Sequence, residues 1–219
     1  MLINEVIVDP NELMVDRTEI VDQIDAGIAK YIEIIKIKAS DALTDMSNTR
    51  RFLYRGIKTG PDVFVGRPRI DRQSRDTAPE IQEIIDTHLD FLGYLALRRN
   101  SLFCAGYDIT GGPDAALSLY GIPYYIFPFD GFKYTWSSKI KDITDIFGNG
   151  MYGANPYLVD KLDHMQPKEF EAKYAFHDDD FAGALQSGCE IYINGQYAAI
   201  CCGSIDRLSL ARRLGIWSE

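Results

Sequence analysis

The sequence predicts an α+β protein with a mostly antiparallel β core and an α-helical N-terminal segment. Helical spacing of apolar residues dominates before residue 100, and short apolar runs bounded by Gly, Pro, Asn and Asp dominate after it. Two turn signals between such runs, Asp130-Gly131 and Asn194-Gly195, are typical of β-hairpins because both turn residues tolerate positive φ. We therefore expect a helical segment over residues 1–48, packed on a second unit over residues 49–219.

The composition is that of an ordinary globular protein, with 46% hydrophobic and 25% charged residues. No apolar run approaches the ~20 residues of a membrane span, and the N-terminus lacks the basic and apolar regions of a secretory signal. We expect a cytoplasmic location and no membrane partner. The formal charge of −9 argues against nonspecific nucleic-acid binding as the main role, although a local basic patch stays open.

The cysteines and histidines do not form a metal-binding pattern. None of the four cysteines belongs to a CxxC pair, and the three histidines lie far apart in the sequence. We expect no metal site, and buried thiols in a reducing compartment.

The elements of the first half follow from spacing and punctuation. Apolar residues at helical spacing predict a helix over residues 18–38, and "RFLYRGIK" predicts a strand that ends at Gly56. Residues 58–78 are rich in Pro, Gly and Arg and predict a long loop. A second helix is predicted over residues 79–97, with Thr77 as its cap. The arginines of the loop are expected to form a basic rim, which is either an ordinary solvated loop surface or a contact for an anionic partner or an ADP moiety: Arg67, Arg69, Arg72 and Arg75.

The second half reads mainly as strands. "SLFCAG" predicts a buried strand, and a short helix is expected over Asp114–Tyr120. Residues 148–168 predict a loop, because Gly, Asn and Pro are frequent there. The remaining segments predict two hairpins and two helices: "PYYIFPF" with "KYTWS", "CEIYINGQYAAICC" (189–202), "DDDFAGALQSG" with an acidic cap, and "DRLSLARRLG".

Three polar residues stand at the edges of apolar strands: Arg55, Ser101 and Glu190. Taken singly, each has an ordinary interpretation as a surface arginine, a strand-edge serine or a solvated glutamate. Taken together with their neighbours, they occur in the segments "FLYRG", "NSLFCAG", "DAALSLYG" and "EIYINGQYAAI". In this order the segments resemble the arginine-serine-glutamate class of ADP-ribosyltransferases over residues 50–202, with a general likeness to phage-encoded members.

The resemblance implies a fold of ADP-ribosyltransferase type and NAD as the substrate. It implies that Arg55 binds the pyrophosphate of NAD, since a guanidinium matches phosphate oxygens bidentately, and that Gly56 lets the backbone approach the ligand. Glu190 is implied as the catalytic carboxylate that stabilises the cation developing on the ribose. Ser101 is implied as a second catalytic residue that orients this carboxylate. Aromatic residues are available to stack on nicotinamide: Tyr54, Phe103, Tyr107 and Tyr120.

Two departures from the family pattern leave the acceptor open. Gly188 stands where related enzymes carry Glu or Gln, and Cys104-Ala105-Gly106 stands where the family has Ser-Thr-Ser. The expected function is an NAD-dependent mono-ADP-ribosyltransferase or an NAD glycohydrolase, with a protein, nucleic acid, small molecule or water as acceptor. The alternative is a non-catalytic structural or partner-binding protein on the same fold. If the chain is encoded by a phage, its place would be the host cytoplasm or the virion.

Overall fold

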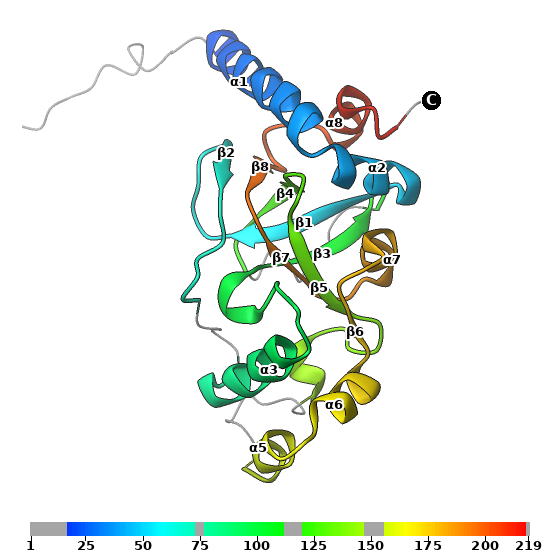
Figure 1. Ribbon diagram of the computed structural model, residues 1–219. Coiled ribbons are helices and arrows are strands. Elements are labelled where there is room, and N and C mark those ends of the chain that lie inside the picture. Colours follow the sequence, from blue (N-terminus) through cyan, green and yellow to red (C-terminus); the bar gives the residue numbers. More distant parts are fainter. Residues whose placement is uncertain (1–16, 73–76, 112–119, 147–155, 218–219) are drawn as a thin grey trace, which may run out of the picture.

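An eight-stranded antiparallel sheet forms the centre of the protein (Figure 1). The computed structural model describes residues 17–72, 77–111, 120–146 and 156–217. The strand order is β2-β8-β4-β1-β3-β7-β5-β6, so the prediction of an α+β protein with an antiparallel core is confirmed. The strands are β1 (Arg51–Ile57), β2 (Val63–Gly66), β3 (Leu102–Asp108), β4 (Ile122–Pro128), β5 (Lys133–Ser137), β6 (Phe176–His177), β7 (Ile191–Asn194) and β8 (Tyr197–Cys201).

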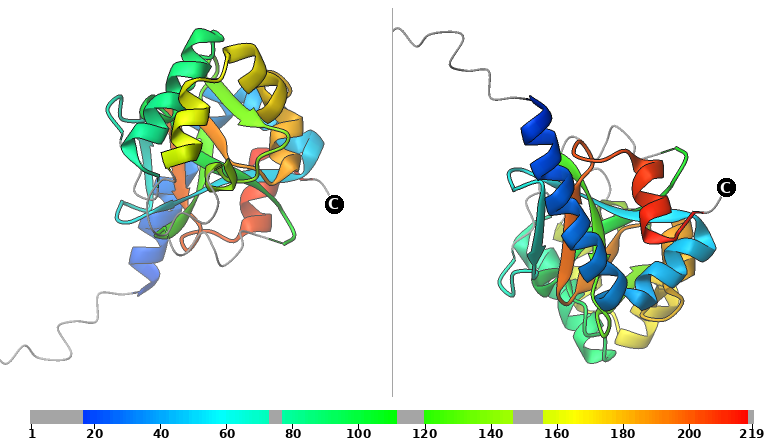
Figure 2. Two further views of the ribbon diagram at one scale, coloured as in Figure 1. Left: turned by 90° about the horizontal axis from the view of Figure 1, so that it is seen from below. Right: turned by 90° about the horizontal axis from the view of Figure 1, so that it is seen from above.

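The helices gather at two ends of this sheet (Figures 1 and 2). At one end, α1 (Arg17–Lys38), α2 (Ser40–Thr49) and α8 (Arg207–Leu214) pack on a large apolar core. At the other end, α3 (Pro79–Phe91), α5 (Pro156–Asp163) and α6 (Pro167–Tyr174) enclose a smaller one.

Helix α7 (Phe181–Ser187) lies against β3 and β1. Within the described ranges, no helix has the length and apolar character that crossing a bilayer would need.

The sheet forks between β1 and β3. These strands pair from Arg51 with Asp108 to Tyr54 with Ala105, and then they part. Beyond this point β1 continues beside β4, whereas β3 continues beside β7. One branch therefore holds β1, β4, β8 and β2, and the other holds β3, β7, β5 and β6.

Both predicted hairpins are wrong, although their strands exist. β4 and β5 lie in different branches of the fork, and so do β7 and β8. The two turn segments instead carry the chain across the sheet side by side: Phe129 N donates to Gln196 O over 2.8 Å. A Cβ at Gly195, where φ is +150°, would lie 3.0 Å from the Cβ of Phe132. Each Asx-Gly signal marked a turn correctly, but the apolar faces of the flanking strands found partners elsewhere.

Three element boundaries also differ from the predictions. The segment 58–78 contains β2, because the edge of β8 offers backbone partners that a local composition does not reveal. Helix α3 begins at Pro79, as predicted, but its N-cap residue is Ala78 rather than Thr77, and it ends at Phe91, before Gly93 at φ +90°. Helix α5 lies within the predicted loop 148–168.

The acidic cap predicted for α7 is confirmed, because Asp180 accepts from Gly183 N. The predicted terminal helix α8 is also present, and Asp206 caps it by accepting from Ser209 N. The helix predicted over Asp114–Tyr120 lies outside the described residues, apart from Tyr120.

Gly106 provides a test of the packing between β3 and α7. A Cβ at this position would overlap the carbonyl oxygen of Leu185, which is backbone and cannot rotate away. We expect Gly106→Ala to lower the free energy of unfolding by ~1–3 kcal/mol, measured by urea denaturation. The matched control is Gly27→Ala, whose Cβ would meet nothing within 4 Å in α1 and which should stabilise the protein by ~0.5–1 kcal/mol. Equal stability of the Gly106 variant and the wild type would contradict the close contact.

Candidate functional site

The fork exposes the edge of β3 that β1 has left, and two arginines cover it. Arg55, on the branch formed by β1, donates from Nη1 to the carbonyl oxygen of Phe103 over 2.9 Å. Arg72 donates from Nη1 to the carbonyl oxygen of Ser101 over 3.2 Å. The backbone of Arg72 is itself fixed, because its N–H donates to Arg99 O and its carbonyl accepts from Gln82 Nε2.

The half-buried ring of Phe103 is the centre of this cluster. The Cζ atom of Arg72 lies 3.6 Å from the ring centroid, and that of Arg98 lies 4.5 Å from it. The ring of Tyr192, directly across from Phe103 on β7, has its centroid 5.2 Å away. A guanidinium over an aromatic face is attracted by the ring quadrupole, so Phe103 helps to hold two cations close together.

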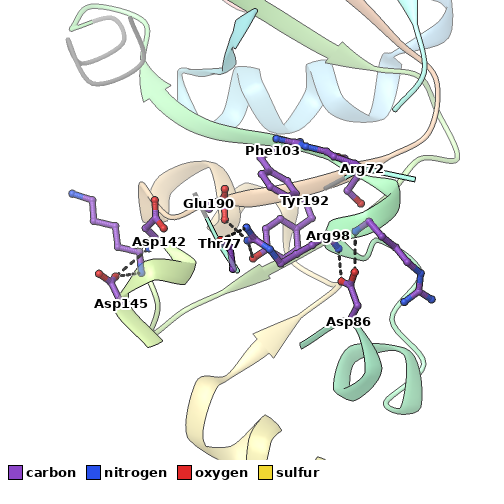
Figure 3. A network of polar contacts seen from close by, with 12 residues as sticks. Arg72, Thr77, Asp86, Arg98, Phe103, Asp142, Asp145, Glu190 and Tyr192 are labelled. Atoms are coloured by element: carbon purple, nitrogen blue, oxygen red, sulfur yellow. Dashed lines mark hydrogen bonds and ion pairs between the residues drawn. The ribbon is translucent and has the colours of Figure 1, made fainter. Parts of the chain in front are cut away.

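Glu190 directly precedes β7 and forms a buried ion pair with Arg98 (Figure 3). Nη1 of Arg98 lies 3.0 Å from Oε2 of Glu190 and donates to the hydroxyl of Tyr192 over 2.8 Å. The side chain of Arg98 is 2% exposed and that of Glu190 is 22% exposed. Nη2 of Arg98 also donates to Thr77 Oγ1, which explains why Thr77 does not cap α3.

The carboxylate of Asp86 fixes the backbone that carries Arg98. Its two oxygens accept from the N–H groups of Arg98 and Arg99 over 2.6 and 3.0 Å. Asp86 lies on the buried face of α3 with 2% exposure, and burial raises the pKa of its carboxyl group. These two hydrogen bonds join α3 to the start of β3 and thereby set the position of the Arg98 guanidinium.

Two like charges of the cluster lie close together. Burial, followed by repulsion from Arg55, lowers the pKa of Arg72 to about 10. Around Arg98, neighbouring carboxylates balance the positive charge: those of Glu190, Asp86 and Asp142. Burial raises the pKa of Glu190, the charge of Arg98 opposes that rise, and Asp142 adds to it. The repulsion between Arg55 and Arg72 favours an anionic ligand beside these two guanidiniums.

The thiol of Cys104 interacts electrostatically with three of these side chains. Burial raises the pKa of its thiol to about 12, while Arg55 and Arg72 lower it and Glu190 raises it further. The thiol is therefore an inert, protonated group within the electrostatic reach of all three side chains.

The structure brings Arg55, Phe103 and Glu190 to this cluster, but not the hydroxyl of Ser101. The Ser101 hydroxyl donates to Asn100 Oδ1, and only its carbonyl contacts the cluster, through Arg72. The pairing of β3 with β7 ends at Cys104 and Ile191, directly before the position of Glu190.

The other residues predicted to bind the ligand lie in three different parts of the fold. Tyr54 is fully buried, with its ring against Phe52, Tyr107 and Tyr125 in the core. Gly56 is buried in β1, paired with Pro123 of β4. Tyr120 lies on the connection before β4 and is 47% exposed.

Sequence reasoning missed Arg98, Tyr192 and Asp86, and it treated Arg72 only as part of an exposed rim. One signal was present: Gln82 and Asp86 interrupt the apolar face of α3 at a spacing of four residues, and both are buried. A buried carboxylate on a helix requires donors from another element. The signal does not say which of the neighbouring Arg98 and Arg99 is buried.

Two further observations concern metal binding and the position of a surface hollow. Among the residues that the structure describes, no group of three or more His, Cys, Asp or Glu side chains could hold a metal ion. A hollow of about 360 Å³ lies between α3 and α5, lined partly by Glu80, Glu83 and Asp163. Its lining shares no residue with the cluster around Phe103, so the candidate site rests on contacts and charge rather than on this hollow.

Comparisons of the chain with protein-family models, with curated proteins and with solved structures found no match. The geometry and charge of the fork are therefore the basis for assigning a function.

Two aspartates of α3 test the anchoring of Arg98. We expect Asp86→Ala to lower the free energy of unfolding by ~1–3 kcal/mol, because it leaves two buried backbone N–H groups without acceptors. Asp90→Ala on the same helix removes an exposed ion pair with Arg99 and should change stability by under ~1 kcal/mol. Thermal and urea denaturation of both variants measure the difference. Similar small losses in the two variants would contradict the anchoring role of Asp86.

Proposed function

We propose that this chain is an NAD-consuming enzyme of the ADP-ribosyltransferase type, acting as a mono-ADP-ribosyltransferase or an NAD glycohydrolase. One observation carries the proposal: Arg55 and Arg72 bind the carbonyls of Phe103 and Ser101, while Glu190 pairs with Arg98 beside the same Phe103 ring. The order of Arg55 on β1 and Glu190 before β7, with β3 between these strands, agrees with the resemblance in the sequence. The acceptor of the ADP-ribosyl group is not specified by these residues.

Arg55 and Arg72 are suited to the pyrophosphate of NAD. Each uses Nη1 on a carbonyl of β3, and a guanidinium has five N–H donors in a fixed fork. The remaining donors can engage phosphate oxygens bidentately. An anion there would also relieve the repulsion between Arg55 and Arg72, which contributes to the lowered pKa of Arg72. Phe103 offers an aromatic ring beside them for a base or for nicotinamide.

Glu190 would act at the glycosidic bond. When the bond between ribose C1′ and the nicotinamide nitrogen breaks, its electron pair leaves with nicotinamide, which departs as a neutral molecule. Positive charge develops on the ribose, and a fixed carboxylate stabilises it. The oxygen or nitrogen of an acceptor then bonds to C1′ and releases its proton to solvent. In this scheme Glu190 must be ionised.

A second candidate function is binding of a dinucleotide without cleavage. It is favoured by the ion pair that engages Oε2 of Glu190 and by the hydroxyl of Ser101, which binds Asn100 instead of the carboxylate. Both candidates share the anion site at Arg55 and Arg72. They differ in whether nicotinamide is released.

Nicotinamide release from NAD, with and without candidate acceptors, tests catalysis. We expect the wild type to release nicotinamide and Glu190→Gln to do so ~10²–10³-fold more slowly, because the charge opposite the developing cation is lost. The matched control is Glu83→Gln, at an exposed position of α3, which should leave the rate unchanged. Binding of NAD without release by the wild type would favour the second candidate. A wild type that neither binds NAD nor releases nicotinamide would refute the proposal.

Calorimetric titration with ADP-ribose tests the anion site separately. Arg55→Lys and Arg72→Lys keep the charge but lose the bidentate donors, so we expect each to weaken binding about tenfold or more, since a hydrogen bond to a charged group contributes ~1.5–3 kcal/mol. Arg69→Lys is the control, because Arg69 is exposed and pairs with Asp71. Unchanged affinity in both variants would show that the pyrophosphate binds elsewhere.

A further inference from the structure

Arg98 has several contacts besides its ion pair with Glu190. Asp86 fixes its backbone, and Thr77 Oγ1 and the hydroxyl of Tyr192 bind its guanidinium. These contacts come from α3, from the segment before it and from β7. A side chain that is 2% exposed and bound from several elements is a rigid support for its neighbours.

The carboxylate of Glu190, by contrast, depends on Arg98. The backbone N–H of Glu190 donates to Lys141 O, which fixes the main chain but not the side chain. Among the described residues, Arg98 is the hydrogen-bond partner of the carboxylate, through Oε2 at 3.0 Å. Oε1 is thereby left for another group, and the side chain is 22% exposed at this point.

The predicted serine does not supply such a partner. The hydroxyl of Ser101, to which the sequence resemblance gave the role of orienting the carboxylate, is engaged by Asn100. Among the described residues, no hydrogen bond joins a hydroxyl of β3 to Glu190. The guanidinium of Arg98 binds the carboxylate instead (Figure 3).

We propose that Arg98 is the positioning residue for Glu190: it binds Oε2, directs Oε1 to the ligand and places a positive charge beside the carboxylate. This inference rests on the proposed function for its catalytic meaning. Burial raises the pKa of Glu190 and the charge of Arg98 opposes that rise, whereas the carboxylate of Asp142 adds to it. Arg72 makes a smaller contribution of the same sign as Arg98. Tyr192 supports Arg98 and does not contact the carboxylate in any described hydrogen bond.

The test is the titration of the Glu190 side-chain carboxyl, followed by carbon-13 NMR and assigned with Glu190→Gln. In Arg98→Gln we expect the pKa of Glu190 to rise by ~1–3 units, because an opposite charge at contact distance is removed. Arg98→Lys should rise less, because the charge remains. Tyr192→Phe should raise the pKa slightly, and Tyr94→Phe should not. Tyr94 is the matched control, since it is also buried and its hydroxyl donates to Phe176 O, away from Glu190.

The pH profile of nicotinamide release gives the second readout. Only ionised Glu190 is active, so the rate should fall as the pH drops through its pKa, and this acidic limb should move to higher pH in Arg98→Gln. We expect kcat to fall with little change in KM, because Arg55 and Arg72 bind the pyrophosphate. In Arg98→Lys part of the rate should return.

The outcomes separate the two proposals. An unmoved carboxyl titration in both Arg98 variants, with only lower melting temperatures, would make Arg98 purely structural and overturn the inference. If Arg98→Gln does not fold, Arg98→Lys and Tyr192→Phe against Tyr94→Phe decide the same question. A shifted titration in a protein that never releases nicotinamide would instead retain the role of Arg98 and reject the enzymatic function.

Discussion

The parting of β1 from β3 after four paired residues determines the rest of the candidate site. A strand edge without a neighbouring strand leaves backbone carbonyls to be satisfied by other donors. In this protein the donors are arginine side chains. They add positive charge to this strand edge, whereas a paired strand would have offered only uncharged backbone N–H groups. Phe103 lies on β3 at this separation, and the guanidiniums of Arg72 and Arg98 lie over its ring.

Bringing arginines and carboxylates together in a partly buried site costs free energy. Removing charges from water is unfavourable, and a buried ion pair repays that cost only when the remaining donors and acceptors are also satisfied. Many of these partners are supplied by the Thr77 and Tyr192 hydroxyls and the Phe103 carbonyl, while Asp86 satisfies the backbone that carries Arg98. The pKa of Arg72 is lowered, first by burial and then by the charge of Arg55. Shifted pKa values of this kind are common in binding sites.

Features set by neighbours in the sequence were predictable, and features set by distant partners were not. The caps at Asp180 and Asp206 follow from side chains that bind a backbone N–H three residues later. The Asn194-Gly195 turn was also predictable, because it depends on the two turn residues themselves. The strand that pairs with β7, however, depends on side-chain packing across the sheet. The pairing of Arg98 rather than Arg99 with Glu190 depends on the position of α3, which no local pattern encodes. Glu190 stood out because a carboxylate at the head of an apolar strand needs an explanation within the sequence itself.

The two branches of the fork are interleaved along the chain. β1 and β2 belong to one branch, β3 to the other, β4 to the first again, β5 to β7 to the second, and β8 to the first. No continuous stretch of the polypeptide therefore contains one branch by itself, and neither branch can form as an independent folding unit. Separating the two branches therefore breaks many contacts between residues that lie far apart in the sequence. Opening of the fork is thus coupled to cooperative unfolding of the whole sheet, and any molecule bound there would stabilise the entire fold rather than a local element.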